Sequence, residues 1–252
     1  MCTVTYIPKP DGFLLTSSRD EKINRTTLPP RSYTHNHQEL IYPKDTKGLG
    51  SWIAISHKKR IACLLNGAFE NHAKKETYTK SRGLILTESF NYLMIDDFIN
   101  DIDLLQTEPF TLLLLDYHTE IICFKELVWD GTKKHINSIN PNQPKIWSSA
   151  TLYDLETRKN RSQWFANWLI QLNNLNNIEP LDFHLRKHSS NDAQNILMKR
   201  ENDLQTVSIS KIEMNSQQTE FNYIDLLNNT KNNLIISSWL NRLFHDCNVW
   251  QR

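Results

Sequence analysis

Glycine is scarce in this chain of 252 residues, with six glycines beside nine prolines. Where breakers are this rare, each one is a stronger sign of a turn or loop. Long apolar runs are also missing. The longest, Leu112–Leu115, is far shorter than the roughly 20 residues that cross a bilayer, so the sequence predicts no integral membrane segment.

An excess of charge of either sign is likewise absent. The 29 basic and 28 acidic residues give a formal charge of +1, which argues against a nucleic-acid partner or a strongly acidic substrate. No cysteine belongs to a C-x-x-C pair or to a zinc-type spacing. The four are Cys2, Cys63, Cys123 and Cys247. We expect reduced thiols and, because no secretory leader is recognisable, a cytoplasmic protein.

Pairs of short apolar runs around turn-forming residues dominate the chain and predict β-hairpins. Four such pairs cover residues 4–15, 52–65, 110–127 and 207–224. Residues 145–151 are a further strand candidate, and residues 24–48, which hold three prolines, predict a long irregular segment. The leucines of residues 112–115 predict a strand that is buried on both faces.

Apolar residues at helical spacing separate these hairpins. The predicted helices cover residues 81–94, 96–105, 154–173, 181–198 and 234–250. Ser81 is the expected N-cap of the first of them. The alternation of hairpins and helices indicates an α+β layered fold with antiparallel sheets. We expect a single domain over residues 1–252.

The first hairpin brings reactive residues together at its open end. A two-residue loop at residues 10–11 places Cys2 opposite Arg19, and one at residues 11–12 places Cys2 opposite Glu21. Because side chains alternate between faces, both registers put Cys2 and Arg19 on the same face. A three-residue loop would break this parity.

These residue types suit a self-contained nucleophile. If Met1 is removed, Cys2 carries both a thiol and a free α-amine, and the amine can take the thiol proton. The Arg19 guanidinium would favour the thiolate. Asp20, on the other face or at the strand end, can hydrogen-bond the ammonium. The alternative is a frayed terminus followed by a solvated turn.

The opening stretch resembles the NRDE family, also called the transport and Golgi organisation protein two-like family. Members begin Met-Cys and carry Asn-Arg-Asp-Glu one hairpin later, which here reads Ser18-Arg19-Asp20-Glu21. Further blocks follow in the family's order within residues 1–175. They are Gly48–Ser56 (GLGSWIAIS), Ala62–Asn66 (ACLLN), Ser81–Gly83 (SRG) and Ile146–Ala150 (IWSSA).

This resemblance implies an N-terminal-nucleophile (Ntn) hydrolase-like αββα sandwich, in which two antiparallel sheets lie between helical layers. It also implies a distant likeness to penicillin V acylases and bile salt hydrolases, which cut non-peptide amide bonds. Arg19 and Asp20 are the counterparts of an arginine and an aspartate that contact the nucleophile there. That pair is separated by two residues in the acylases and adjacent here, so either Asp20 or Glu21 can hold the aspartate's role.

Three other residues are candidates for the same site. Asn66 can donate its amide to an oxyanion, although it also suits a turn before Gly67. Ser149 stands where an acylase-like asparagine is expected, and Arg82 can point into the cleft or into solvent. The spacings of His35/His37 and His184/His188 can serve metals, but no third ligand is recognisable, so we predict no metal and no cofactor.

Two functions remain open from the sequence. In the first, Cys2 is the nucleophile of an amidohydrolase, with Arg19, Asp20 and Asn66 in support and a small-molecule amide as substrate. In the second, the same cleft holds haem or an acyl lipid without catalysis, as the resemblance to eukaryotic family members implies. Haem would need an axial His or Cys, for which Cys2 is available. The oligomeric state is not predicted.

Overall fold

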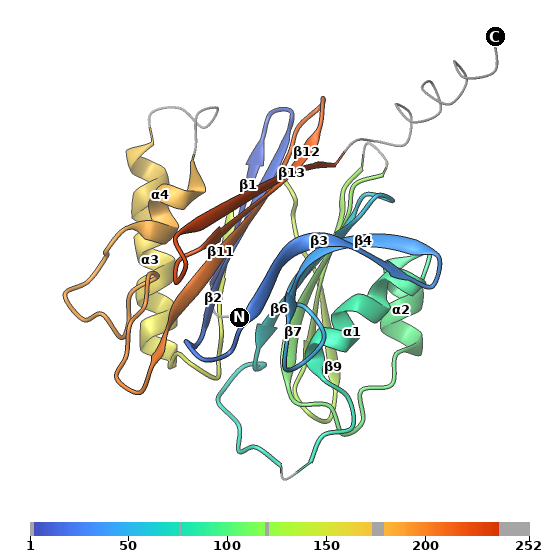
Figure 1. Cartoon of the computed structure of the whole chain (residues 1–252), viewed down its shortest axis with the longest axis horizontal. Helices are drawn as coiled ribbons and strands as arrows, with labels where there is room; N and C mark the ends of the chain where they lie inside the picture. Colours follow the sequence, from blue (N-terminus) through green and yellow to red (C-terminus); the bar gives the residue numbers. More distant parts are fainter. Residues whose placement is uncertain (1–2, 76, 119–120, 173–178, 237–252) are drawn as a thin grey trace.

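Two antiparallel sheets pack face to face in the structure, a computed structural model that describes residues 3–75, 77–118, 121–172 and 179–236 (Figure 1). The first sheet has six strands, which in spatial order are β10 (Lys145–Ser148), β1 (Thr3–Lys9), β2 (Gly12–Lys22), β11 (Leu204–Met214), β12 (Thr219–Asp225) and β13 (Thr230–Ile236). The second has seven, which are β3 (Thr27–His35), β4 (Gln38–Asp45), β5 (Ile53–Ser56), β6 (Arg60–Asn66), β7 (Phe110–Asp116), β8 (Cys123–Trp129) and β9 (Lys134–Ser138).

Helices cover the outer face of each sheet (Figure 1). On the first sheet lie α3 (Leu155–Gln171) and α4 (Pro180–Leu185), and on the second lie α1 (Arg82–Glu88), the 3₁₀ turn Ser89–Asn91 and α2 (Ile95–Asp101). The α3 stripe of Phe165 and Trp168 packs on Ile7 and Leu14 of the first hairpin. The order helix, sheet, sheet, helix is the predicted αββα sandwich, and the α+β fold class is confirmed.

The main core lies between the sheets, and the alternation of strand side chains builds it. Val4 and Phe13 point into this core, whereas Ile7 and Leu14 on the same hairpin point outward to α3. All seven residues of β7 are buried, with Leu113 facing the other sheet and its neighbours facing the helices. This confirms the strand predicted to be buried on both faces.

The prediction of an irregular segment over residues 24–48 is wrong. These residues form the hairpin of β3 and β4, at one edge of the second sheet. Proline is tolerated there because an edge strand has unpaired backbone groups, and the β3–β4 register is irregular between Leu28 and Arg31, where Pro29 and Pro30 lie.

Two helix predictions also need correction. The helix predicted over residues 181–198 ends at Leu185, because the turn-forming residues 189–192 follow, and residues 186–203 are turns, bends and irregular backbone with one bridge residue. The sequence also predicts a helix over residues 234–250, but residues 234–236 belong to β13, and residues 237–250 lie outside the described part of the chain. Strand β9 was not predicted. Ser81 does precede α1, but its side chain makes no capping hydrogen bond.

Candidate active site

Of the two predicted registers, the first hairpin adopts the one with its loop at residues 10–11. Lys9 pairs with Gly12 and Thr3 pairs with Ser18, so residues 10–11 form the loop. At Gly12 a Cβ atom would lie 1.9 Å from the carbonyl oxygen of Met214, so β11 leaves room for glycine alone. Cys2 lies outside the described residues. Its covalent neighbour Thr3 pairs with the residue before Arg19.

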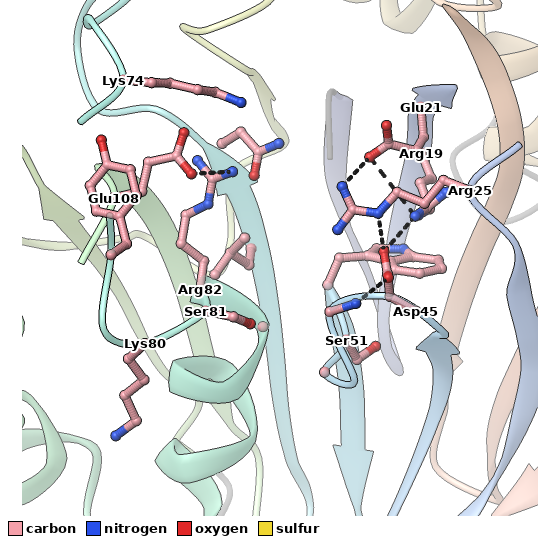
Figure 2. A pocket seen from close by; sticks show the side chains of 17 residues that line it. Arg19, Glu21, Arg25, Asp45, Ser51, Lys74, Lys80, Ser81, Arg82 and Glu108 are labelled. Atoms are coloured by element: carbon pink, nitrogen blue, oxygen red, sulfur yellow. Dashed lines mark hydrogen bonds and ion pairs between the residues drawn. The ribbon is translucent and has the colours of Figure 1, made fainter. Parts of the chain in front are cut away.

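A cavity of about 420 Å³ opens at the end of β2 (Figure 2). It brings together Arg19, Glu21, Asn66 and Arg82. The remaining lining residues are Arg25, Asp45, Gly48, Gly50, Ser51, Trp52, Leu64, Lys74, Tyr78, Lys80, Ser81, Gly83 and Glu108. Neither Asp20 nor Ser149 is among the described residues that line it.

One wall of the cavity is a network of two arginines and two carboxylates. Arg19 Nη2 lies 2.7 Å from Asp45 Oδ2, and Arg25 lies 2.8 Å from Asp45 and 3.0 Å from Glu21. Burial would raise the pKa of Asp45, but the hydrogen bond from the Gly48 N–H and the charges of Arg25 and Arg19 outweigh burial and hold this pKa below its ordinary value. Asp45 is therefore ionised and fixes Arg19 in place.

Arg19 keeps one donor unused within this network. Its guanidinium lies over the Trp52 ring, with Cζ 4.7 Å from the ring centroid, and the whole residue is 3% exposed. Nη1 is buried and has no hydrogen-bond partner in the described part of the chain. A buried N–H of a charged group that lacks an acceptor is costly, so this nitrogen is available to an acceptor that enters the cavity.

The opposite wall is formed by the start of α1 and the loop before β7. Arg82 Nη2 lies 3.1 Å from Glu108 Oε2, and Nη1 donates to the carbonyl oxygen of Pro109 at 3.2 Å. His72 Nε2 lies 3.4 Å from the other oxygen of Glu108. In Figure 2 Arg82 and Glu108 face the arginine–carboxylate wall across the cavity.

Asp20 turns to the other face of β2, as alternation requires. Its carboxylate accepts hydrogen bonds from Tyr153 Oη at 2.5 Å and from Thr206 Oγ1 at 2.6 Å. Asp20 is 3% exposed, so these two hydroxyls hold it within the protein. Arg19 and Asp20 therefore share a strand end but contact different layers of the sandwich.

Two buried residues support the same strand ends: Arg161, which the sequence analysis did not name, and His184, which it considered only as a metal ligand. Arg161 on α3 donates to Thr3 Oγ1 at 2.6 Å and to the carbonyl oxygen of Gln194 at 3.0 Å. His184 on α4 bridges the hairpin, with Nδ1 2.7 Å from Ser18 Oγ and Nε2 2.9 Å from Thr5 Oγ1.

Both residues have ionisable side chains, which are rarely buried completely. Both are 0% exposed, and burial lowers the pKa of His184 to about 3, so His184 is neutral. Arg161 stacks on Tyr153, with Cζ 3.5 Å from the ring centroid. The sequence carries one sign that Arg161 is buried: it lies four residues before Phe165 and therefore on the same face of α3.

Ser149 and Asn66 are in contact, although not through the two side chains. Ser149 Oγ donates to the backbone carbonyl of Asn66 at 2.8 Å and lies 2.9 Å from Thr151 Oγ1. Asn66 ends β6 at the cavity and is followed by Gly67, whose φ of 85° is left-handed. Ser149 thus supports the strand end that carries Asn66.

The histidine pairs do not form metal sites in the described part of the chain. No group of three or more His, Cys, Asp or Glu side chains there is arranged to hold a metal. His184 lies on α4, whereas His188 lies beyond its end and stacks on Trp164, so the two do not share a helix face. His35 Nε2 is 2.6 Å from the Tyr42 hydroxyl.

The architecture is that of the Ntn-hydrolase-like proteins. It is similar to a variant of the conjugated bile acid hydrolase from Clostridium perfringens, with a TM-score of 0.59 and 10% identity over 93% of this chain and 92% of that one. It is also similar to penicillin V acylase from Agrobacterium tumefaciens, with a TM-score of 0.56 and 12% identity over 93% and 86% of the two chains. At this identity the likeness is one of fold.

The family follows from the sequence itself. A family model described as Transport and Golgi organisation 2 matches residues 1–237, so the chain belongs to that family. The resemblance over residues 1–175 is thereby confirmed and extends through β13. No curated protein matches the chain. Within the described residues, no helix has the length and apolar character needed to cross a membrane.

Proposed function

We propose that this protein is an amidohydrolase whose nucleophile is the thiol of Cys2 and whose substrate is a small molecule with a non-peptide amide bond. The observation that carries the proposal is the buried Nη1 of Arg19, a residue that lines the cavity, because this nitrogen has no hydrogen-bond partner among the described residues. In β1 the even-numbered Val4 and Tyr6 face the space between the sheets, as Arg19 does. A Cys2 that continues this alternation would present its sulfur on the face of that guanidinium.

The chemistry follows from these placements. With Met1 removed, the α-amine of Cys2 takes the thiol proton, and Arg19 stabilises the thiolate. The thiolate attacks the amide carbonyl, and the Asn66 side chain donates to the oxygen as it becomes negative. The C–N bond then breaks, the leaving amine takes the proton from the ammonium, and water hydrolyses the thioester to release the acid and the thiol. Asp20 is proposed to orient the ammonium, and the names of the fold neighbours, a hydrolase and an acylase, support an amide substrate.

Labelling with a limiting thiol electrophile tests this proposal. We expect Cys2 to react first, because burial raises the pKa of Cys63 to about 12 and burial also raises that of Cys123. Peptide mapping identifies the labelled thiol, and intact mass shows whether Met1 is absent. Labelling of Cys2 no faster than the other three cysteines would exclude an activated nucleophile.

Arg19→Gln separates activation from simple exposure. If Arg19 stabilises the thiolate, this variant should slow Cys2 labelling by about tenfold near pH 7, the effect of roughly one pKa unit, and much less near pH 10, where most thiol is ionised. Lys22→Gln on the same strand is the matched control, because Lys22 is exposed and does not line the cavity. An equal effect of both substitutions would contradict a role for Arg19.

The carrier alternative has less support from the cavity. Haem would need an axial His or Cys, and neither occurs among the described residues that line it, so Cys2 would have to serve. Titration of haem against the native chain and Cys2→Ala distinguishes the two functions. Binding without any turnover of amides would favour the carrier, whereas turnover that vanishes in Cys2→Ala supports the hydrolase.

A further inference from the structure

The cavity holds more positive than negative side chains. Its charged lining residues are Arg19, Arg25, Lys74, Lys80 and Arg82, against Glu21, Asp45 and Glu108. A simple excess of cations is weak support for an anion site, because ion pairs with residues outside the lining can cancel it. The partners of each charge therefore have to be followed one by one.

Each of the three carboxylates is already engaged. Asp45 is bound by Arg19 and Arg25 and also accepts the N–H groups of Lys47 and Gly48 at 3.0 and 2.7 Å. Glu21 pairs with Arg25 at 3.0 Å and accepts its neighbour's N–H at 2.9 Å. Glu108 pairs with Arg82 at 3.1 Å. The carboxylates therefore leave little acceptor capacity for a cationic ligand.

Among the cations, Lys74 differs from the others. Lys80 pairs with Glu88 outside the cavity, and the three arginines pair with the lining carboxylates. Lys74 has no ion pair with any residue in the described ranges. Figure 2 shows its side chain reaching across one end of the cavity, beyond the Arg82–Glu108 pair. The loop that carries it is closed by the Lys75 N–H, which donates to the Tyr78 hydroxyl at 3.0 Å.

We propose that Lys74 binds an anionic group, a carboxylate or a phosphate, on the small molecule that enters this cavity. The inference rests on the proposed function, which makes this cavity the substrate site and an amide the substrate, and it adds the acidic character of that substrate. The unpaired ammonium would complete its ion pair with the ligand, while the Asn66 side chain, which also lines the cavity, is left for the neutral amide. The substrate is thus an acidic amide whose anionic group binds Lys74.

Binding to Cys2→Ala tests this without turnover. The probes are hexanoylglycine, its neutral analogue hexanoylglycinamide, and hexyl phosphate, each measured by isothermal titration calorimetry. We expect at least one anionic probe to bind about fivefold more tightly than the amide, the upper range for an ion pair open to solvent, and the difference to shrink as salt rises from about 50 to about 500 mM. The stronger of the two anionic probes identifies the preferred group.

Substitutions within one loop provide matched controls. In the same background, Lys74→Gln should abolish the preference for the anionic probe, Lys74→Arg should retain it, and Lys75→Gln should leave it unchanged. Lys74 and Lys75 are both exposed, so loss of folding is not expected, and only Lys74 lines the cavity. Equal effects at the two lysines, equal affinity for acid and amide, or no binding of either anionic probe at millimolar concentration would each overturn the inference.

The two proposals fail separately in this design. If Cys2→Ala prefers the anionic probes and this preference depends on Lys74, but the native chain cleaves neither hexanoylglycine nor hexanoylglycinamide, the anion site is supported and the hydrolase is not. If the native chain cleaves hexanoylglycinamide as well as hexanoylglycine, and Lys74→Gln leaves both rates unchanged, the hydrolase stands and the anion site does not.

Discussion

At the scale of single residues, adjacent side chains of β2 serve different layers. Arg19 faces the cavity, whereas Ser18 and Asp20 lie on the other face of β2, where Ser18 contacts the His184 imidazole and Asp20 accepts hydrogen bonds from the Tyr153 and Thr206 hydroxyls. His184 has each ring nitrogen next to one hydroxyl, so it acts as both donor and acceptor only while neutral. Protonation would replace its acceptor by a second donor and place an unpaired charge in the interior.

His184 should therefore make stability depend on pH. The folded-state pKa of about 3 lies below the unfolded value, so the unfolded chain takes up a proton first as pH falls. The resulting stability is fully present above about pH 6.5 and is lost between there and about pH 3, at up to ~1.4 kcal/mol per pH unit. His184→Gln should lower the free energy of unfolding by about 1–3 kcal/mol near pH 7 and remove this part of the pH dependence.

Urea unfolding between about pH 7 and pH 4 measures both effects. The difference between the native chain and His184→Gln should narrow as pH falls. His37→Asn is the control, because His37 is exposed at a turn with a φ of 64°, which asparagine tolerates. A constant difference across this range would show that His184 does not titrate as its burial requires.

At the scale of elements, two glycines explain why distant motifs meet at the cavity. A Cβ atom at Gly50 would lie 2.5 Å from the carbonyl carbon of Gly83, and one at Gly83 would lie 2.9 Å from the carbonyl oxygen of Ser51. Such distances are available only without side chains. The close approach joins the loop before β5 to the start of α1 and so places Arg82 opposite the arginine–carboxylate wall.

Gly50→Ala should separate these two elements. Because the obstructing atoms are backbone, we expect a loss of about 1–3 kcal/mol in the free energy of unfolding and weaker binding of the anionic probes in the cavity. Gly48→Ala is a matched control two residues away, where the nearest atom to a Cβ would be Arg25 Nη2 at 3.4 Å, an ordinary contact. Urea denaturation and calorimetry measure both. Similar losses at the two positions would rule out the close approach as the cause.

The sequence predicted the parts of the fold that rest on local patterns. The first hairpin and the stripe of α3 follow from alternation and helical spacing, and a two-residue loop narrows the register of Thr3 and Ser18 to two choices. Edge strand β3 was missed because prolines mark breaks in local patterns, while an edge strand accepts them.

The sequence predicted only those parts of the candidate site that lie close together along the chain. The hydroxyls that bind Asp20 come from Tyr153 and Thr206, 133 and 186 residues away, and His184 lies 166 residues from Ser18. No local pattern encodes such pairs, since packing of the sheets and helices creates them. The Asp45 partner of Arg19 was missed for a related reason, because its strand was taken for an irregular segment.

At the scale of the whole molecule, the two sheets are held together by a core that includes the thiol of Cys63. Cys63 on β6 is 0% exposed in the cluster between the sheets, and its thiol hydrogen-bonds Ser17 of the other sheet. No reagent can reach this sulfur while the sheets stay packed. Its reactivity is therefore a direct measure of how often the sandwich opens.

A chain with Cys63 as its only cysteine, made by Cys2→Ser, Cys123→Ser and Cys247→Ser, should label at least about 10³-fold more slowly when folded than when unfolded in urea. If opening requires separation of the sheets, the labelling rate should rise with urea along the same slope as global unfolding followed by tryptophan fluorescence. A second chain that retains only Cys123, which is half-buried on β8, should label with a much weaker urea dependence. A labelling rate of Cys63 that does not change with urea would mean that the sheets separate locally, without global unfolding. It would contradict the idea that the two sheets and the cavity walls between them open only when the whole chain unfolds.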